Sequence, residues 1–70
     1  MAWEVTVLTV NSIYSAIARD GLRRIVLHGT TAECTLFHRR GPRRDTSCEF
    51  RGLLTADTAE DIWQQAKMPT

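Results

Sequence analysis

The 70-residue sequence is poor in the residues that carry most enzyme and metal chemistry. It contains only two histidines and two cysteines, and it lacks a glycine-rich phosphate loop, a nucleophile elbow, an HExxH motif and a CxxC motif. Cys34 and His38 are separated by about 13 Å if both lie in one strand at ~3.3 Å per residue. That distance excludes a hydrogen-bonded pair or a shared metal ion. We therefore expect no enzyme activity and no cofactor, although a zinc site using other pairings stays open.

Long apolar runs are also absent. No stretch approaches the roughly 18 consecutive apolar residues of a membrane span, and residues 1–4 lack the basic start and apolar core of a signal peptide. Seventy residues are close to the smallest length that folds around its own core, so we expect one domain over residues 1–70. Together these features predict a soluble protein of the cytoplasm.

The two cysteines fall on the inward-facing sides of two predicted strands, where cysteine is commonly buried. In a reducing cytoplasm we expect Cys34 and Cys48 to stay as thiols. A disulfide between them is the alternative, because a hairpin centred near Gly41 would place them opposite or diagonal to one another.

Lysine is nearly missing, since eight of the nine basic residues are arginine. Arginine favours planar, multidentate contacts with carboxylate or phosphate groups. The net charge is only +1, but residues 1–18 carry −1, residues 19–44 carry +5 and residues 45–70 carry −3. Such a distribution indicates either two surfaces with different partners or internal charge pairing, which is the commoner case.

What the sequence does contain is a series of strand patterns followed by one helix pattern. Apolar and β-branched residues alternate with polar ones, or form short runs bounded by turn residues. The predicted strands are residues 3–10, 22–28, 31–38 and 45–54. The last two runs flank a Gly-Pro pair and predict an antiparallel hairpin.

The C-terminal segment has the pattern of an amphipathic helix. Asp57 and Glu60 have the spacing of a capping box at its start, and Pro69 ends the pattern. Four apolar residues at helical spacing form one stripe: Ala59, Ile62, Trp63 and Ala66. We expect this helix to lie across one face of the sheet.

Residues 11–21 fit two structures. As a helix, this segment would begin at Asn11 or Ser12 and end at a left-handed Gly21. As a strand, it would join the next strand through a two-residue Asp20-Gly21 turn. The capping residues favour the helix, near residues 12–19. The expected fold class is α+β: a small antiparallel sheet of three to five strands, the C-terminal helix on one face, and this short second helix.

The densest group of charges lies in residues 38–44, where a Gly-Pro pair separates two pairs of arginines. Adjacent Gly and Pro predict an exposed hairpin loop. Phe37 is out of phase with the apolar residues of its strand, and one arginine of the neighbouring strand can join the same face. The predicted binding surface consists of Arg39, Arg40, Arg43, Arg44, Phe37 and Arg24. A solvated turn that aids solubility is the alternative interpretation.

These features favour a small binding protein that acts on a larger protein or complex. We expect an inhibitor or adaptor of the kind that phages and mobile elements encode, anti-CRISPR proteins included. The second hypothesis is a nucleic-acid-binding module that uses the arginine-rich residues 38–44. A third hypothesis is a homo-oligomer that assembles through an uncovered sheet face or an edge strand. The expected state is a monomer or a homodimer with no membrane partner.

Overall fold

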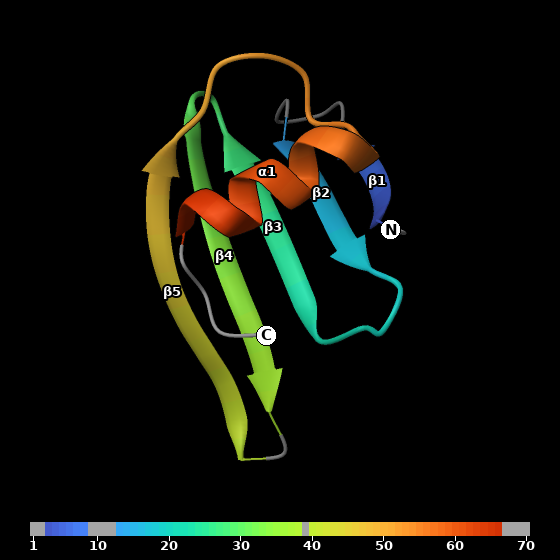
Figure 1. Ribbon diagram of the computed structural model, residues 1–70, viewed down its shortest axis with the longest axis vertical. Coiled ribbons are helices and arrows are strands. Elements are labelled where there is room, and N and C mark those ends of the chain that lie inside the picture. The colour runs from blue at the N-terminus through green and yellow to red at the C-terminus, as the bar shows by residue number, and fades with distance from the viewer. Residues whose placement is uncertain (1–2, 9–12, 39, 67–70) are drawn as a thin grey trace.

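Five strands and one helix make up the part of the chain that the structure, a computed structural model, describes. It describes residues 3–8, 13–38 and 40–66, except for the side chains of residues 8, 38 and 42–46. The elements are β1 (Trp3–Leu8), β2 (Ile13–Ala18), β3 (Arg23–His28), β4 (Thr31–His38), β5 (Gly41–Glu49) and α1 (Ala56–Ala66). The strands are antiparallel and follow one another in the sheet in chain order. Figure 1 shows α1 lying across one face of this sheet, which confirms the expected α+β class.

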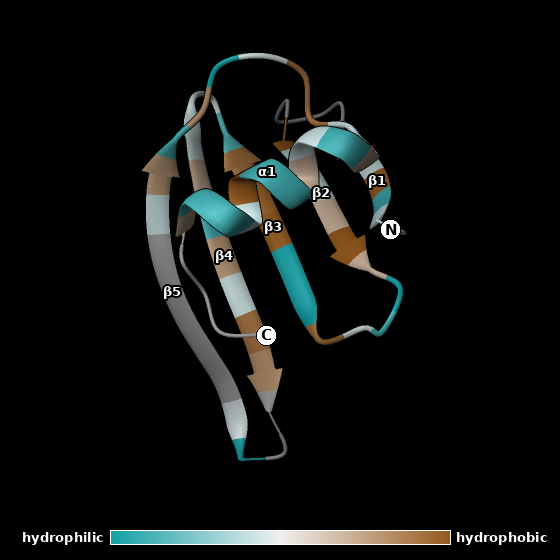
Figure 2. Cartoon of the chain, viewed as in Figure 1, coloured by the Kyte–Doolittle hydropathy of each residue, from teal (hydrophilic) through white to brown (hydrophobic). Residues whose placement is uncertain are grey.

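The hydrophobic core lies between α1 and the face of the sheet beneath it, and we call this the covered face. The helix buries all four residues of the predicted stripe: Ala59, Ile62, Trp63 and Ala66. Opposite them, Ile25 on β3 and Ala32 on β4 are completely buried. Figure 2 shows the apolar bands of the central strands passing beneath the helix. Removal of this apolar surface from water is the main force that holds the helix on the sheet.

The prediction of a helix near residues 12–19 is wrong, because Ile13–Ala18 forms β2. It pairs with β1 on one side and with β3 on the other. Ala16 and Ala18 are buried, whereas Ile17 between them is 46% exposed, which is the period of two that defines a strand. Capping residues give only a weak local preference, and backbone pairing on both sides outweighs it.

The connection from β2 to β3 is also longer than the two-residue turn of the strand alternative, since it covers residues 19–22. The Asp20 carboxylate accepts a hydrogen bond from the Leu22 N–H at 2.8 Å, and the Gly21 N–H donates to the Ala18 carbonyl at 2.8 Å. Gly21 has a φ of 75°, a conformation that side chains other than glycine rarely adopt. This turn therefore depends on the Asp-Gly pair, although in a different geometry.

The other predicted strands differ from the structure mainly at their ends. Thr31–His38 has the predicted bounds, and β3 begins one residue later than predicted. The first strand is described through Leu8, so residues 9–10 lie outside the described residues. The last strand is Gly41–Glu49 rather than residues 45–54. Proline is tolerated there because β5 is an edge strand, where an absent N–H interrupts no central pairing.

The helix begins earlier than the predicted capping box implied. Its cap is Thr55, whose hydroxyl accepts a hydrogen bond from the Thr58 N–H at 3.2 Å. The Thr58 hydroxyl accepts one in return from the Thr55 N–H at 2.6 Å. These reciprocal bonds satisfy two terminal N–H groups, which is the role that the sequence assigned to Asp57 and Glu60. The predicted stop at Pro69 lies outside the described residues.

Candidate functional site

The arginine-rich stretch is a strand end rather than a loop of seven residues. The backbone register pairs Phe37 with Pro42, Leu36 with Arg43 and Thr35 with Arg44. Only residues 39 and 40 separate β4 from β5, and Arg40 is exposed in this turn. Arg39 and the side chains of Arg43 and Arg44 lie outside the described residues. The hairpin loop is therefore shorter than predicted, because Arg43 and Arg44 belong to a paired strand beside it.

The opposite face of the sheet carries no described element, and we call it the uncovered face. The strand pairings bring a row of side chains together across its middle: Glu4 on β1, Ile17 on β2, Arg24 on β3 and Thr35 on β4. Val26 and Phe37, which are half-buried, flank this row. The uncovered face thus combines apolar side chains with one central arginine. In Figure 1 this face lies behind the sheet, away from α1.

Arg24 and Phe37 are two predicted binding residues that the structure brings together. The Arg24 guanidinium carbon lies 5.0 Å from the centroid of the Phe37 ring, within the range of a cation–π interaction. The backbone fixes this pair, because the Phe37 N–H donates to the Leu22 carbonyl at 2.7 Å and continues the β3–β4 pairing. Arg24 Nε is inaccessible to solvent and has no hydrogen-bond acceptor among the described residues. An acceptor of a bound partner would satisfy it once a shift of the Arg24 side chain exposes this nitrogen.

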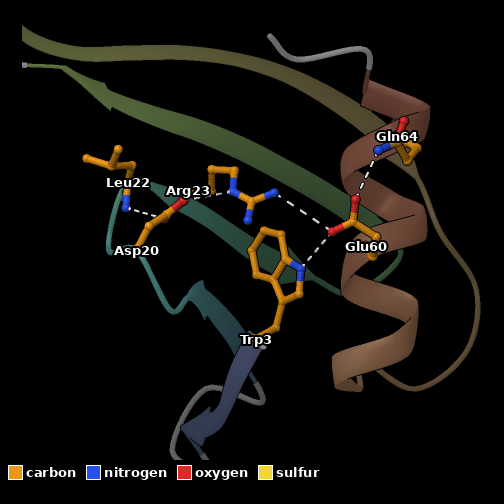
Figure 3. Close-up of polar contacts among 6 residues, drawn as sticks. All are labelled: Trp3, Asp20, Leu22, Arg23, Glu60 and Gln64. Carbon is orange, nitrogen blue, oxygen red and sulfur yellow. Dashed lines mark hydrogen bonds and ion pairs between the residues drawn. The ribbon is translucent and has the colours of Figure 1, made fainter. Parts of the chain in front are cut away.

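Arg23 lies in an environment opposite to that of Arg24, and the sequence did not indicate its contacts. Its guanidinium carbon lies 5.0 Å from the Trp3 ring centroid and 5.8 Å from that of Trp63. Its nitrogens lie 3.5 Å from an Asp20 oxygen and 3.8 Å from a Glu60 oxygen. Figure 3 shows Arg23 reaching from β3 toward α1 beside Trp3. The signal for its position was the alternation of side chains along a strand, since residues 23, 25 and 27 share a face.

Glu60 joins the sheet to the helix at this cluster. It accepts hydrogen bonds from Gln64 Nε2 at 2.9 Å and from Trp3 Nε1 at 3.1 Å (Figure 3). The Gln64 bond, followed by the Trp3 bond and the charge of Arg23, lowers the pKa of the Glu60 carboxyl. The charged groups of the cluster contact one another, although Trp63 Nε1 is buried without an acceptor among the described residues. We assign the cluster a structural role.

The residues considered for nucleophilic or metal chemistry do not converge. His28 lies on the uncovered face, half exposed and 3.9 Å from Glu33, whereas Cys34 is completely buried beneath α1. Cys48 is a half-buried thiol, and the register places it opposite Ala32, whereas Cys34 lies opposite Thr46. Burial raises the pKa of the Cys48 thiol, which makes it less reactive. Within the described ranges, no three His, Cys, Asp or Glu side chains gather to hold a metal ion.

Comparisons with protein-family models, with curated proteins and with solved structures found no match. Among the described residues, no helix has the length and apolar character needed to cross a membrane. The functional interpretation therefore depends on the geometry of the two sheet faces.

Proposed function

We propose that this protein is a small binding protein that docks on a larger protein, as an inhibitor or adaptor, through the uncovered face of its sheet. The observation that carries the proposal is Arg24. It lies at the middle of that face, packs on Phe37 and has a solvent-inaccessible Nε without an acceptor among the described residues. In contrast, the neighbouring Arg23 is engaged by aromatic rings and two carboxylates.

The chemistry of this surface favours an acidic protein partner. A carboxylate binds arginine in a fixed, often bidentate geometry, and such a bond is stronger when apolar side chains exclude water around it. Ile17, which is 46% exposed, and half-buried Val26 supply that apolar surround. Arginine with aromatic and aliphatic neighbours is a common composition of binding hot spots.

The proposal extends to the setting in which the protein acts. We place the protein in the cytoplasm, where a thiol such as that of Cys48 stays reduced. Its small size and its single sheet suit proteins that phages and mobile elements encode against host machines, with anti-CRISPR proteins as one class. A partner from such a machine would supply the acidic surface.

The test is affinity capture from the native host with three forms of the protein. We expect wild-type protein to retain a stoichiometric partner, and Arg24→Gln to weaken the measured affinity at least about tenfold, as expected for a hot-spot arginine. Arg19→Gln is the matched control, because Arg19 is an exposed arginine in the connection beside β3. Equal affinity of all three forms for the captured protein would refute the assignment of Arg24.

Nucleic-acid binding is the other outcome of this experiment. Thr35 pairs with Arg24 on one side and with Arg44 on the other, so a second arginine position follows Arg24 across the sheet. If RNA or DNA is captured, binding should weaken steeply with salt, at about 0.9 in the logarithmic slope for each phosphate contact. Replacement of Arg39, Arg40, Arg43 and Arg44 by serine should then abolish a mobility shift. A nucleic-acid partner lost on these replacements would overturn the protein-partner proposal.

A further inference from the structure

The two edges of the sheet differ in how well they resist pairing with another strand. The β5 edge contains Pro42, and its register with β4 shifts between Cys34 and Thr35, so that Asp45 is skipped. Proline, charge and an irregular register are features that protect an edge strand. The β5 edge is therefore a poor template for a further strand.

The β1 edge has less of this protection among its described residues. Trp3–Leu8 pairs with β2 in an unbroken register over its whole length, and no described strand pairs with its other side. It contains no proline, and Glu4 is its one charged residue. Val7 is 47% exposed although it shares a face with buried Trp3. The strand thus presents backbone groups that pair with no other described strand, next to exposed apolar surface.

We infer that β1 pairs antiparallel with β1 of a second copy of this chain. Directly opposed residues of an antiparallel pair share a face, so Val5 can lie opposite Val5 of the second copy on a two-fold axis. Glu4 then lies opposite Thr6 of the second copy, and Trp3 opposite its Val7. A shift of one residue toward the N-terminus in each strand would oppose the two Glu4 carboxylates, which disfavours that register.

The residues of β1 favour a second copy as the strand that pairs with this edge. The strand opposes no like charges in this register, because its one carboxylate meets a hydroxyl that can donate a hydrogen bond to it, and an aromatic residue meets a β-branched one. The two-fold axis is perpendicular to the sheet, so both helices lie on one side. The two uncovered faces then form one continuous surface, which carries Arg24 from each copy. The inference goes beyond the proposed function, and it requires no other partner.

The experiment measures the mass of the purified protein by analytical ultracentrifugation from about 1 μM to about 1 mM. We expect a concentration-dependent dimer. Thr6→Glu places two like-charged pairs across the axis and should raise the dimer dissociation constant about tenfold. Thr6→Gln adds similar bulk without charge and should leave the dimer unchanged. Far-UV circular dichroism establishes that each variant is folded.

A charge exchange tests the register itself. In the double variant Glu4→Lys with Thr6→Glu, each lysine lies opposite a glutamate of the second copy, so the dimer should return to at least wild-type affinity. A monomer at every concentration would overturn the inference, as would a dimer that Thr6→Glu does not weaken. Failure of the double variant to restore a dimer weakened by Thr6→Glu would overturn the register. None of these outcomes depends on whether Arg24 binds a partner.

Discussion

Arg23 and Arg24 are adjacent in the sequence and identical in chemistry, but they serve the two faces of the sheet differently. Arg23 lies on the covered face, beside two tryptophan rings and within 4 Å of two carboxylates. Arg24 lies on the uncovered face against one phenylalanine ring, with a solvent-inaccessible Nε that no described residue satisfies. The comparison teaches that a shift of one residue along a strand separates an arginine engaged by two carboxylates from one whose Nε has no described acceptor.

The next pair of residues repeats this difference with apolar side chains. Ile25 is completely buried beneath α1, whereas Val26 is half-buried on the uncovered face. A continuous apolar run such as residues 25–27 is typical of a strand covered on both faces. The structure covers one face only, and the apolar residue on the other face contributes to the proposed docking surface.

The largest expected effect is a loss of stability when a buried side chain of the covered face is removed. Ile25→Ala removes a buried side chain and leaves a cavity, so it should reduce the free energy of unfolding by about 2–5 kcal/mol. Val26→Ala, one residue along the same strand, should cost less than half as much because its side chain already contacts water. Chemical denaturation of both variants measures the difference. Equal losses would show that the uncovered face is buried in the folded protein.

A smaller effect separates the two arginines. Arg23→Ala removes a partly desolvated cation from two aromatic rings and should reduce the free energy of unfolding by about 2 kcal/mol. Arg24→Ala should cost less than about 1 kcal/mol, because it loses one cation–π contact, whereas Arg23→Ala loses two together with two ion pairs. Arg23→Met keeps the bulk without the charge, so it separates packing from cation–π attraction. A larger loss for Arg24→Ala than for Arg23→Ala would contradict the structural role given to Arg23.

The smallest expected effect is a pH dependence of the covered-face cluster. Because its pKa is lowered in the folded state, Glu60 contributes stability above its unfolded pKa, and this contribution is lost as the pH falls through the folded pKa. Wild-type protein should therefore lose more stability between about pH 5 and about pH 3 than Glu60→Gln does. Asp61→Asn leaves the Glu60 contacts intact and should keep the wild-type pH dependence. Identical curves for wild type and Glu60→Gln would exclude this contribution.

The sequence predicted the helix and most of the sheet because their patterns are local and strong. The four-residue apolar stripe of α1 and the bounds of β4 are confirmed. The pattern failed for residues 13–18, where helix caps and strand alternation compete and only pairing with β1 and β3 decides between them. It also failed at Gly41, because Gly-Pro usually interrupts a strand and is tolerated here by an edge position.

The candidate site was predicted in part. Alternation along the strands separated Phe37 from the buried residues of β4, and it showed that only one of the two adjacent arginines could join it. The sequence did not indicate that Trp3 and Trp63, sixty residues apart, would meet at a centroid distance of 5.9 Å beside Arg23. Such contacts depend on how the helix returns across the sheet.

By itself, the sequence determined which residues alternate along each strand, where the helix stripe lies and that arginine dominates the basic residues, since these are properties of spacing and composition. Only the tertiary structure decided which face α1 covers, that residues 13–18 form a strand, and which arginine is held by carboxylates. The physical reason is that backbone pairing and burial are satisfied between segments distant in the chain, and these energies outweigh the local preferences that a sequence displays.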